Sequence, residues 1–287
     1  WVLREYPDAA TLYFGDHRYD DRLRDESAAA VLGRNSATAA FRRRIDLIDA
    51  ARLSAQDRVS LRLLQFRLDA DLAINRGHGS MPFGVFDPWA PVTQMGGLHL
   101  DLPQLAKAAR FQSVADYEAW LKRLDAVPGS VSQLIERMRL AMAAGWVPPK
   151  VAIAGVPKQL EAQLVDDARN SPEYQPFKSF PKDMPAAEQA RLALAGERAI
   201  RDRVIPAFRS LKGFYETSYL AQAAQRLGLS NLPGGPAYYQ AWLDWNTTTH
   251  MTPRQIHDLG LAEVARIGAQ MDASVAASGF KGKRPQF

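Results

Sequence analysis

The residues best suited to chemistry gather in one stretch, L-P-G-G-P-A-Y-Y-Q-A-W-L-D-W-N-T-T-T-H-M-T-P-R-Q-I-H, from Leu232 to His257. Two histidines on one helix can share a zinc ion when they lie four residues apart with a glutamate between them. His250 and His257 are seven residues apart, and His250 precedes the helix start that Thr252 and the following proline predict. These two histidines therefore need not face the same way.

The rest of the chain also lacks the signatures of a metal site or a catalytic nucleophile. No histidine lies three to five residues from another, and none is followed by glutamate. The absence of cysteine excludes disulfides, thiolate metal sites and cysteine nucleophiles. The acidic pairs Asp20-Asp21 and Asp166-Asp167 are expected at exposed positions. We therefore expect neither a catalytic residue nor a metal site within this chain, whose histidines are His17, His78, His99, His250 and His257.

The charge pattern argues against nucleic-acid binding. The 36 Lys and Arg residues and 31 Asp and Glu residues give a net charge of +5, but the two signs are interleaved. The basic clusters at 42–44 and 281–284 have no aromatic residues between them to stack on bases. The apolar runs are also much shorter than the roughly 20 residues that span a bilayer. We expect no nucleic-acid partner and no transmembrane segment.

The apolar spacing predicts an all-α fold, a large multi-helix bundle. Almost every long segment has apolar residues three and four positions apart, which is typical of helices with one buried face. A helix over 36–53 and another that starts at a capping box of Ser54 and Asp57 are expected to pack antiparallel. The residues expected to face inward are Phe41, Ile45 and Ile48 in the first, and Val59, Leu63, Phe66 and Ala70 in the second.

Residues 77–103 interrupt this helical pattern. Their glycines and prolines predict a long loop. A loop of this length needs a role, either as a plug packed across helices or as one wall of a binding cleft. Helices are expected to resume at a second capping box, formed by Ser113 and Asp116, and Gly145 is expected to end the helix after that.

Residues 170–185 contain four prolines and are expected to form a flexible connection. The chain is therefore interpreted as a single helical region, 1–287, with possible sub-lobes at 1–170 and 186–287.

Two further helices are expected in the C-terminal part. The first runs from 186 to about 224 and should kink or break near Val204, because Pro206 cannot donate a backbone hydrogen bond. The second has Thr252 as its cap, with Gln255 three residues later. Gly279 should end this helix, whose apolar face includes Val264, Ile267 and Met271.

The aromatic residues before this last helix have two interpretations. Tyr238, Tyr239, Trp242 and Trp245 recur at helical spacing, which is more typical of a core than of a ligand platform, although tyrosine hydroxyls can reach a cleft. The threonines at 247–249 are expected to form a strained lead-in to the helix cap.

Three motifs in the same order resemble one bacterial family over essentially the whole chain. They are P-D-A-A-T-L-Y-F-G-D-H-R-Y-D-D-R-L near the start, D-Y-E-A-W-L-K-R-L-D-A-V-P followed by G-W-V-P-P-K in the middle, and L-P-G-G-P-A-Y-Y with T-T-T-H-M-T-P-R-Q-I-H-D-L-G-L-A-E-V-A-R-I near the end. Together they resemble the domain-of-unknown-function family 885, DUF885.

The resemblance implies a mostly helical protein related to gluzincin zinc metallopeptidases of the thimet-oligopeptidase and carboxypeptidase Taq kind. In that family a zinc motif of the form H-E-x-x-P-G-H follows the last matching segment, so no metal ligand can be assigned to this chain. The chain is then the N-terminal half, one lobe of the fold, with zinc in the full-length protein only. Many members carry secretion or lipoprotein signals, which implies a periplasmic or secreted location, with the cytoplasm as the alternative.

The resulting expectation is a half-enzyme that positions peptide substrate and is inactive alone. Its candidate substrate-binding residues are Gln94, Tyr238, Tyr239 and His257. The alternative is a non-catalytic helical binding or scaffold module whose loop at 77–103 grips a partner. If the chain packs against a C-terminal half, part of the apolar face of the last helix should be exposed in its absence.

Overall fold

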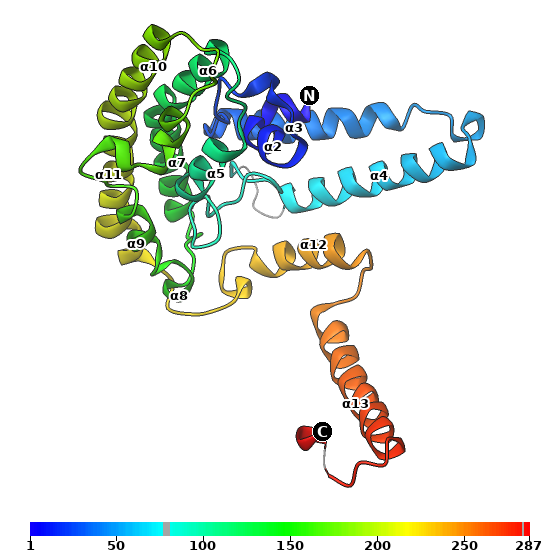
Figure 1. The fold of residues 1–287 in the computed structure, drawn as a ribbon. Coiled ribbons are helices and arrows are strands. Elements are labelled where there is room, and N and C mark those ends of the chain that lie inside the picture. Colours follow the sequence, from blue (N-terminus) through cyan, green and yellow to red (C-terminus); the bar gives the residue numbers. More distant parts are fainter. Residues whose placement is uncertain (77–80, 283) are drawn as a thin grey trace.

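The computed structural model describes residues 1–76, 81–282 and 284–287, and this part of the chain is all-α, with no strand. Figure 1 shows a body of packed helices with two extensions, the hairpin of α3 and α4 and the C-terminal helix α13. The α-helices are α1 (Val2–Glu5), α2 (Pro7–Phe14), α3 (Ala28–Ile45), α4 (Ala55–Arg76), α5 (Leu98–Ala108), α6 (Val114–Asp125), α7 (Val127–Ala143), α8 (Lys150–Ile153), α9 (Val156–Glu161), α10 (Ala186–Ala199), α11 (Ile205–Phe214), α12 (Gly235–Thr247) and α13 (Pro253–Ala277).

The body packs around α6, α7, α10 and α11. Helix α6 starts at the predicted capping box. Ser113 Oγ accepts from the N–H of Asp116, and the Asp116 carboxylate accepts from the N–H of Ser113. From this start α6 buries Trp120 and Leu124 completely. Trp120 Nε1 donates to the carbonyl oxygen of Glu173 at 3.1 Å, which ties α6 to the segment before α10. A locally encoded cap thus sets which face of α6 enters the core.

The predicted antiparallel pair is present, with one boundary shifted. α3 covers 28–45 instead of 36–53, because Ser27 caps it earlier, with its Oγ accepting from the N–H of Ala30. α4 begins where expected, and Ser54 Oγ accepts from the N–H of Asp57 at 3.1 Å.

The predicted inward face of this pair is partly wrong. Ile45 and Ala70 are buried as expected. Because the hairpin projects from the body (Figure 1), much of its apolar stripe has no neighbour to cover it. The exposed fractions are 44% for Ile48, 58% for Val59, 66% for Leu63 and 36% for Phe66.

The Gly/Pro-rich loop is a plug through much of its described length. Phe83, Asp87 and Val92 are each at most 1% exposed. The loop ends at Gly97, earlier than predicted, because α5 starts at Leu98 and contains Pro103. A proline inside a helix removes only one backbone donor, so the helix persists if another group pairs with the freed carbonyl.

The proline-rich residues 170–185 are packed, contrary to the expected flexible connection. Pro172–Lys178 forms a 3-10 helix, and Glu173, Tyr174 and Phe177 are buried. The Phe177 ring lies so close to Gly196 that a Cβ on this glycine would fall 2.4 Å from it. The division of the chain into two lobes at this segment stays a prediction.

The long helix continues through its proline in a distorted form. Between α10 and α11, residues Ile200–Val204 form a π-helix, just before Pro206. The expected irregularity near Val204 is therefore present as a wider, π-helical turn. This turn accommodates Pro206, which has no N–H to donate, without breaking the helix. A second π-helix, Tyr215–Tyr219, follows α11.

Helix α12, which precedes the C-terminal extension, packs against α4. A small apolar cluster that includes Ile74, Trp146 and Tyr238 holds α12 in place. The threonine lead-in is strained as predicted, since Thr248 has a left-handed backbone with φ 56°. The capping box of Thr252 and Gln255 then starts α13.

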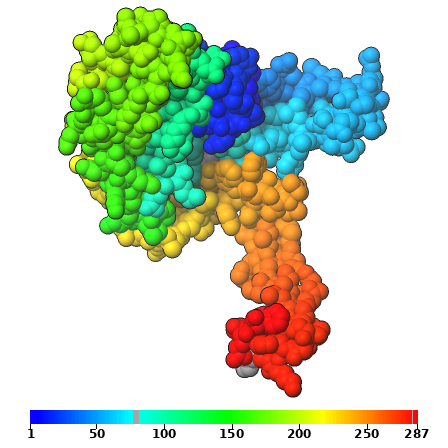
Figure 2. Space-filling view, in the orientation of Figure 1, coloured from blue at the N-terminus to red at the C-terminus, as the bar shows by residue number. Residues whose placement is uncertain are grey.

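α13 stands clear of the body (Figure 2), and its apolar face is exposed, as expected. Val264 is 72% exposed, Ile267 44% and Met271 50%. Among the described residues of this helix only Val275 is buried. No described helix combines the length and the apolar character that crossing a bilayer demands.

Candidate functional site

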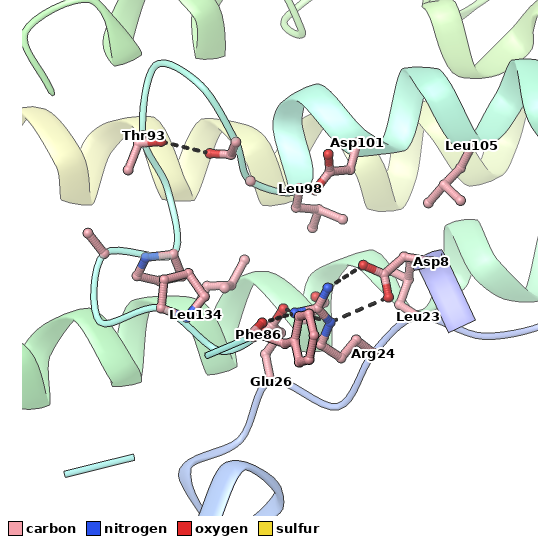
Figure 3. Close-up of a pocket in the computed structure, with 16 residues that line it drawn as sticks. Asp8, Leu23, Arg24, Glu26, Phe86, Thr93, Leu98, Asp101, Leu105 and Leu134 are labelled. Carbon is pink, nitrogen blue, oxygen red and sulfur yellow. Dashed lines mark hydrogen bonds and ion pairs between the residues drawn. The ribbon is translucent and has the colours of Figure 1, made fainter. Parts of the chain in front are cut away.

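A pocket of about 220 Å³ lies between α2, the segment after it, the loop, α5 and α7 (Figure 3). Its walls are largely apolar, and its polar groups come from five separate parts of the chain. The apolar side chains include Leu23, Phe86, Leu98, Leu105 and Leu134, and the polar ones include Asp8, Arg24, Glu26, Asp101 and Ser130.

Arg24 is the single cation in this lining, and its donors are already engaged. The guanidinium donates through Nε and Nη2 to the Asp8 carboxylate, and through Nη1 to the carbonyl oxygen of Phe86 at 2.7 Å. The carboxylates of Glu26 and Asp87 each lie 3.8 Å from it. An incoming anion would therefore compete with three carboxylates for this arginine.

Buried ion pairs beneath the pocket hold these groups in place. Arg34, from α3, donates to Asp87 through Nε at 3.0 Å and Nη2 at 2.8 Å, and both side chains are at most 3% exposed. Arg137, from α7, pairs with Glu26 and donates to the carbonyl oxygen of Pro88 at 2.8 Å. The hairpin, the loop and α7 are thus joined through charge pairs at the base of the pocket.

Asp101 differs from the other carboxylates because it has no cationic partner. It lies in the first turn of α5, across the pocket from Arg24 and Asp8 in Figure 3, and forms no ion pair within the described part of the chain. Burial and the negative charges of Asp8 and Glu26 raise the pKa of Asp101 to about 6, against the opposing effects of Arg24 and a backbone hydrogen bond from Gly97. Burial likewise raises the pKa of Glu26. A carboxyl group that titrates near neutral pH can bind a cation or exchange a proton.

Ser130, from α7, supplies a neutral polar group to the pocket lining. It is 7% exposed and lies on α7 one turn before Leu134. Its backbone N–H continues the helix by donating to Ala126, but its hydroxyl has no hydrogen-bond partner among the described residues. The pocket thus offers one unpaired carboxylate and one unpaired hydroxyl between apolar walls.

The sequence did not reveal this pocket. Asp8, Glu26 and Asp101 are separated along the chain and match no motif, and residues 98–101 lie within the predicted loop, so no signal in the sequence points to this pocket. The expectation that Asp20 is exposed is also wrong. Asp20 is 7% exposed and accepts hydrogen bonds from Thr11 and the buried Arg123, because the N-terminal segment folds onto α6.

The four predicted substrate-binding residues lie elsewhere, and none lines this pocket. Gln94 Oε1 accepts from the N–H of Gly155 at 2.9 Å, so its side chain joins the loop to the start of α9. Tyr238 is 4% exposed, whereas its neighbour Tyr239 is 41% exposed. His257 is exposed in the first turn of α13. A role for these four residues in peptide binding stays a prediction.

The described residues contain no group of three potential metal ligands. His99, although fully buried, contacts Gln159 through Nε2 at 3.2 Å, and burial lowers its pKa. His78 lies outside the described residues. Zinc therefore does not fit a site built from the described residues of this chain alone.

The chain is similar in sequence to a known protein family. The sequence model of the family described as "Bacterial protein of unknown function (DUF885)" matches residues 7–287. The chain belongs to the DUF885 family. No curated protein is detectably similar to this DUF885 chain in sequence.

One solved structure has the same fold. It is described as "the putative lipoprotein from Colwellia psychrerythraea" and matches this DUF885 chain with a TM-score of 0.80 at 21% sequence identity. The match covers 98% of this chain but 50% of the other. The DUF885 chain thus spans about half the length of the structure that it matches.

Proposed function

We propose that this chain is the N-terminal, peptide-positioning half of a zinc-dependent metallopeptidase. The observation that carries the proposal is the uncovered apolar face of α13, with Val264 at 72% exposed. Such a face is typical of a surface that packs against another protein segment. The match to half of a longer chain supports a C-terminal half as that segment.

The zinc site belongs, in this proposal, to the remainder of the protein. Bound zinc would polarise the scissile carbonyl and activate water, with a glutamate outside this chain as general base. The residues here orient the peptide. Tyr239 and His257 are exposed and can contact the peptide directly. Tyr238 is buried and Gln94 is bonded to Gly155, so these two residues act by holding the neighbouring surface residues in position. The chain corresponds, in the same proposal, to one lobe of a thimet-oligopeptidase-like fold.

A periplasmic or secreted location, with a lipid anchor on the full-length protein, is part of the proposal. The description of the similar structure as a lipoprotein supports it.

The decisive experiment uses the full-length protein. Its bound zinc is measured, and it is incubated with a mixed peptide library with and without a chelator. We expect about one zinc ion per catalytic site, cleavage that the chelator abolishes, and no cleavage by residues 1–287 alone. Zinc-free protein without chelator-sensitive cleavage would overturn the proposal.

The alternative, a non-catalytic binding module, is favoured by one observation. The pocket of Asp101 and Ser130 is formed entirely by residues of this chain. Ligand binding by a full-length protein that lacks zinc and peptidase activity would support this alternative.

A further inference from the structure

The pocket of Asp101 and Ser130 has the size for a small group. Pockets for drug-sized ligands have volumes of about 300–1,000 Å³. This one has about 220 Å³. The pocket therefore has room for a single amino-acid side chain or for the terminal residue of a peptide.

Helices α5 and α7 each present both a polar and an apolar side chain to the pocket. Asp101 and Leu105 are one turn apart on α5, and Ser130 and Leu134 are one turn apart on α7, so each pair lies on one face of its helix. All four residues line the pocket. A ligand with a polar head and a short carbon chain matches this pattern.

The charges select the sign of the head group. Three carboxylates and one guanidinium line the pocket, and the guanidinium of Arg24 is held by Asp8 and the Phe86 carbonyl. Asp8 and Glu26 already have arginine partners, whereas Asp101 has none among the described residues, so a cation can pair with Asp101 and an anion would be repelled by it.

The Ser130 hydroxyl supplies a second polar contact that does not depend on Asp101. It belongs to a side chain that is more than nine-tenths buried, and it lacks a partner within the described residues. The hydroxyl is therefore free to accept a hydrogen bond from a ligand donor that enters the pocket.

We propose that this pocket binds a primary ammonium group, with Asp101 as its counter-ion, the Ser130 hydroxyl as an acceptor, and Leu105 and Leu134 against its carbon chain. In a peptide, this group is either the N-terminal ammonium or a lysine side chain. The proposal is independent of peptidase function because it concerns binding and not cleavage.

The test is a titration of the full-length protein with n-butylamine, followed by the NMR signals of the Leu105 and Leu134 methyl groups. Butan-1-ol and butyrate serve as neutral and anionic ligands of similar length. We expect the amine to bind at least about tenfold more tightly than either, because it alone forms a charge-assisted hydrogen bond. Equal binding by the alcohol or tighter binding by butyrate would overturn the proposal.

Three variants locate the binding. Asp101→Asn keeps the shape but removes the charge, and is expected to weaken amine binding about tenfold or more. Ser130→Ala should weaken it by a factor of about 2 to 10. Asp125→Asn, at an exposed carboxylate on α6, should have no effect. Unchanged binding by a folded Asp101→Asn protein would show that the amine binds elsewhere, for example to a metal ion, and would overturn the proposal.

Two further ligands identify the source of the ammonium. Alanyl-alanine amide carries only an N-terminal ammonium, and N-acetyl-lysine amide carries only a side-chain ammonium. Asp101-dependent binding of one or both supports the proposal and names the source. Failure of both to shift the two leucine signals would contradict a role in peptide recognition and overturn it.

Discussion

Gln163 Nε2 donates to the carbonyl oxygen of His99 at 2.9 Å. This oxygen is the acceptor that Pro103 leaves without its usual helical donor, because proline has no N–H. The side chain that follows α9 therefore completes the hydrogen bonding of α5, and so supports the helix that carries Asp101.

Gln163→Met is expected to lower the free energy of unfolding by about 1–3 kcal/mol, because it leaves a buried carbonyl unpaired. Urea unfolding provides the measurement. The matched test is the same substitution combined with Pro103→Ala, which restores an N–H one turn after His99. In that background the cost of Gln163→Met should shrink. An equal cost in both backgrounds would show that the Gln163 hydrogen bond does not replace the proline donor.

Asp101→Asn is expected to stabilise the protein above about pH 6, by about 1–2 kcal/mol after allowance for solvent screening of this partly buried group. On folding, the pKa of Asp101 rises from its ordinary value of 3.8 to about 6, so the native state holds the proton after the unfolded chain has lost it. The stability contributed by this group is complete below the unfolded pKa and is lost as the pH rises through 6.

Urea unfolding of wild type and Asp101→Asn at pH 4 and pH 8 checks this prediction. The two proteins should differ at pH 8 and converge at pH 4. A difference of the same size at both pH values would assign the effect to packing instead of charge. Together with loss of amine binding, greater stability at pH 8 would show that Asp101 serves binding at the expense of folding.

Asp87→Asn is expected to destabilise the protein by about 3–5 kcal/mol, because it breaks a buried pair and leaves Arg34 without its counter-ion. The pair of Arg254 and Asp258 on α13 provides the control, since these side chains are 83% and 51% exposed. Asp258→Asn should change stability little. Similar unfolding midpoints for both variants would contradict the view that the ion pairs under the pocket hold the hairpin, the loop and α7 together.

Replacement of Val264, Ile267 and Met271 by serine is expected to leave the stability of residues 1–287 nearly unchanged, because these side chains are already exposed. The same triple variant should lower the stability of the full-length protein if the C-terminal half covers this face. Val275→Ala, at the buried position of α13, should destabilise both proteins. Thermal unfolding of each pair gives the comparison. A triple variant that leaves the full-length protein unaffected would remove the main support for the half-enzyme proposal.

The sequence predicted local features well and tertiary ones less well. The capping boxes at Ser113 and Thr252 depend on residues within one turn, so their motifs were sufficient. Periodicity identified the apolar stripe of α4, but it could not show whether another element covers Leu63. Pro103 suggested a continuing loop, because its replacement donor, Gln163, is distant in sequence.

The pocket was missed for a related physical reason. Its charged groups come from α2, the segment after it and α5, and only the fold brings them together. The missing ion pair of Asp101 and the unpaired hydroxyl of Ser130 are properties of the surroundings. No residue pattern in the sequence encodes them directly.

The backbone conformation of Thr248 helps to set the direction of α13. α13 has 25 residues and is therefore about 37 Å long. A rotation of about 10° in one backbone torsion at its base would sweep its far end through about 6 Å. The left-handed conformation of Thr248, at φ 56°, lies at this pivot. A few torsion angles between the end of α12 and the start of α13 therefore set the direction of α13. They also set where a second half of the protein would meet its apolar face.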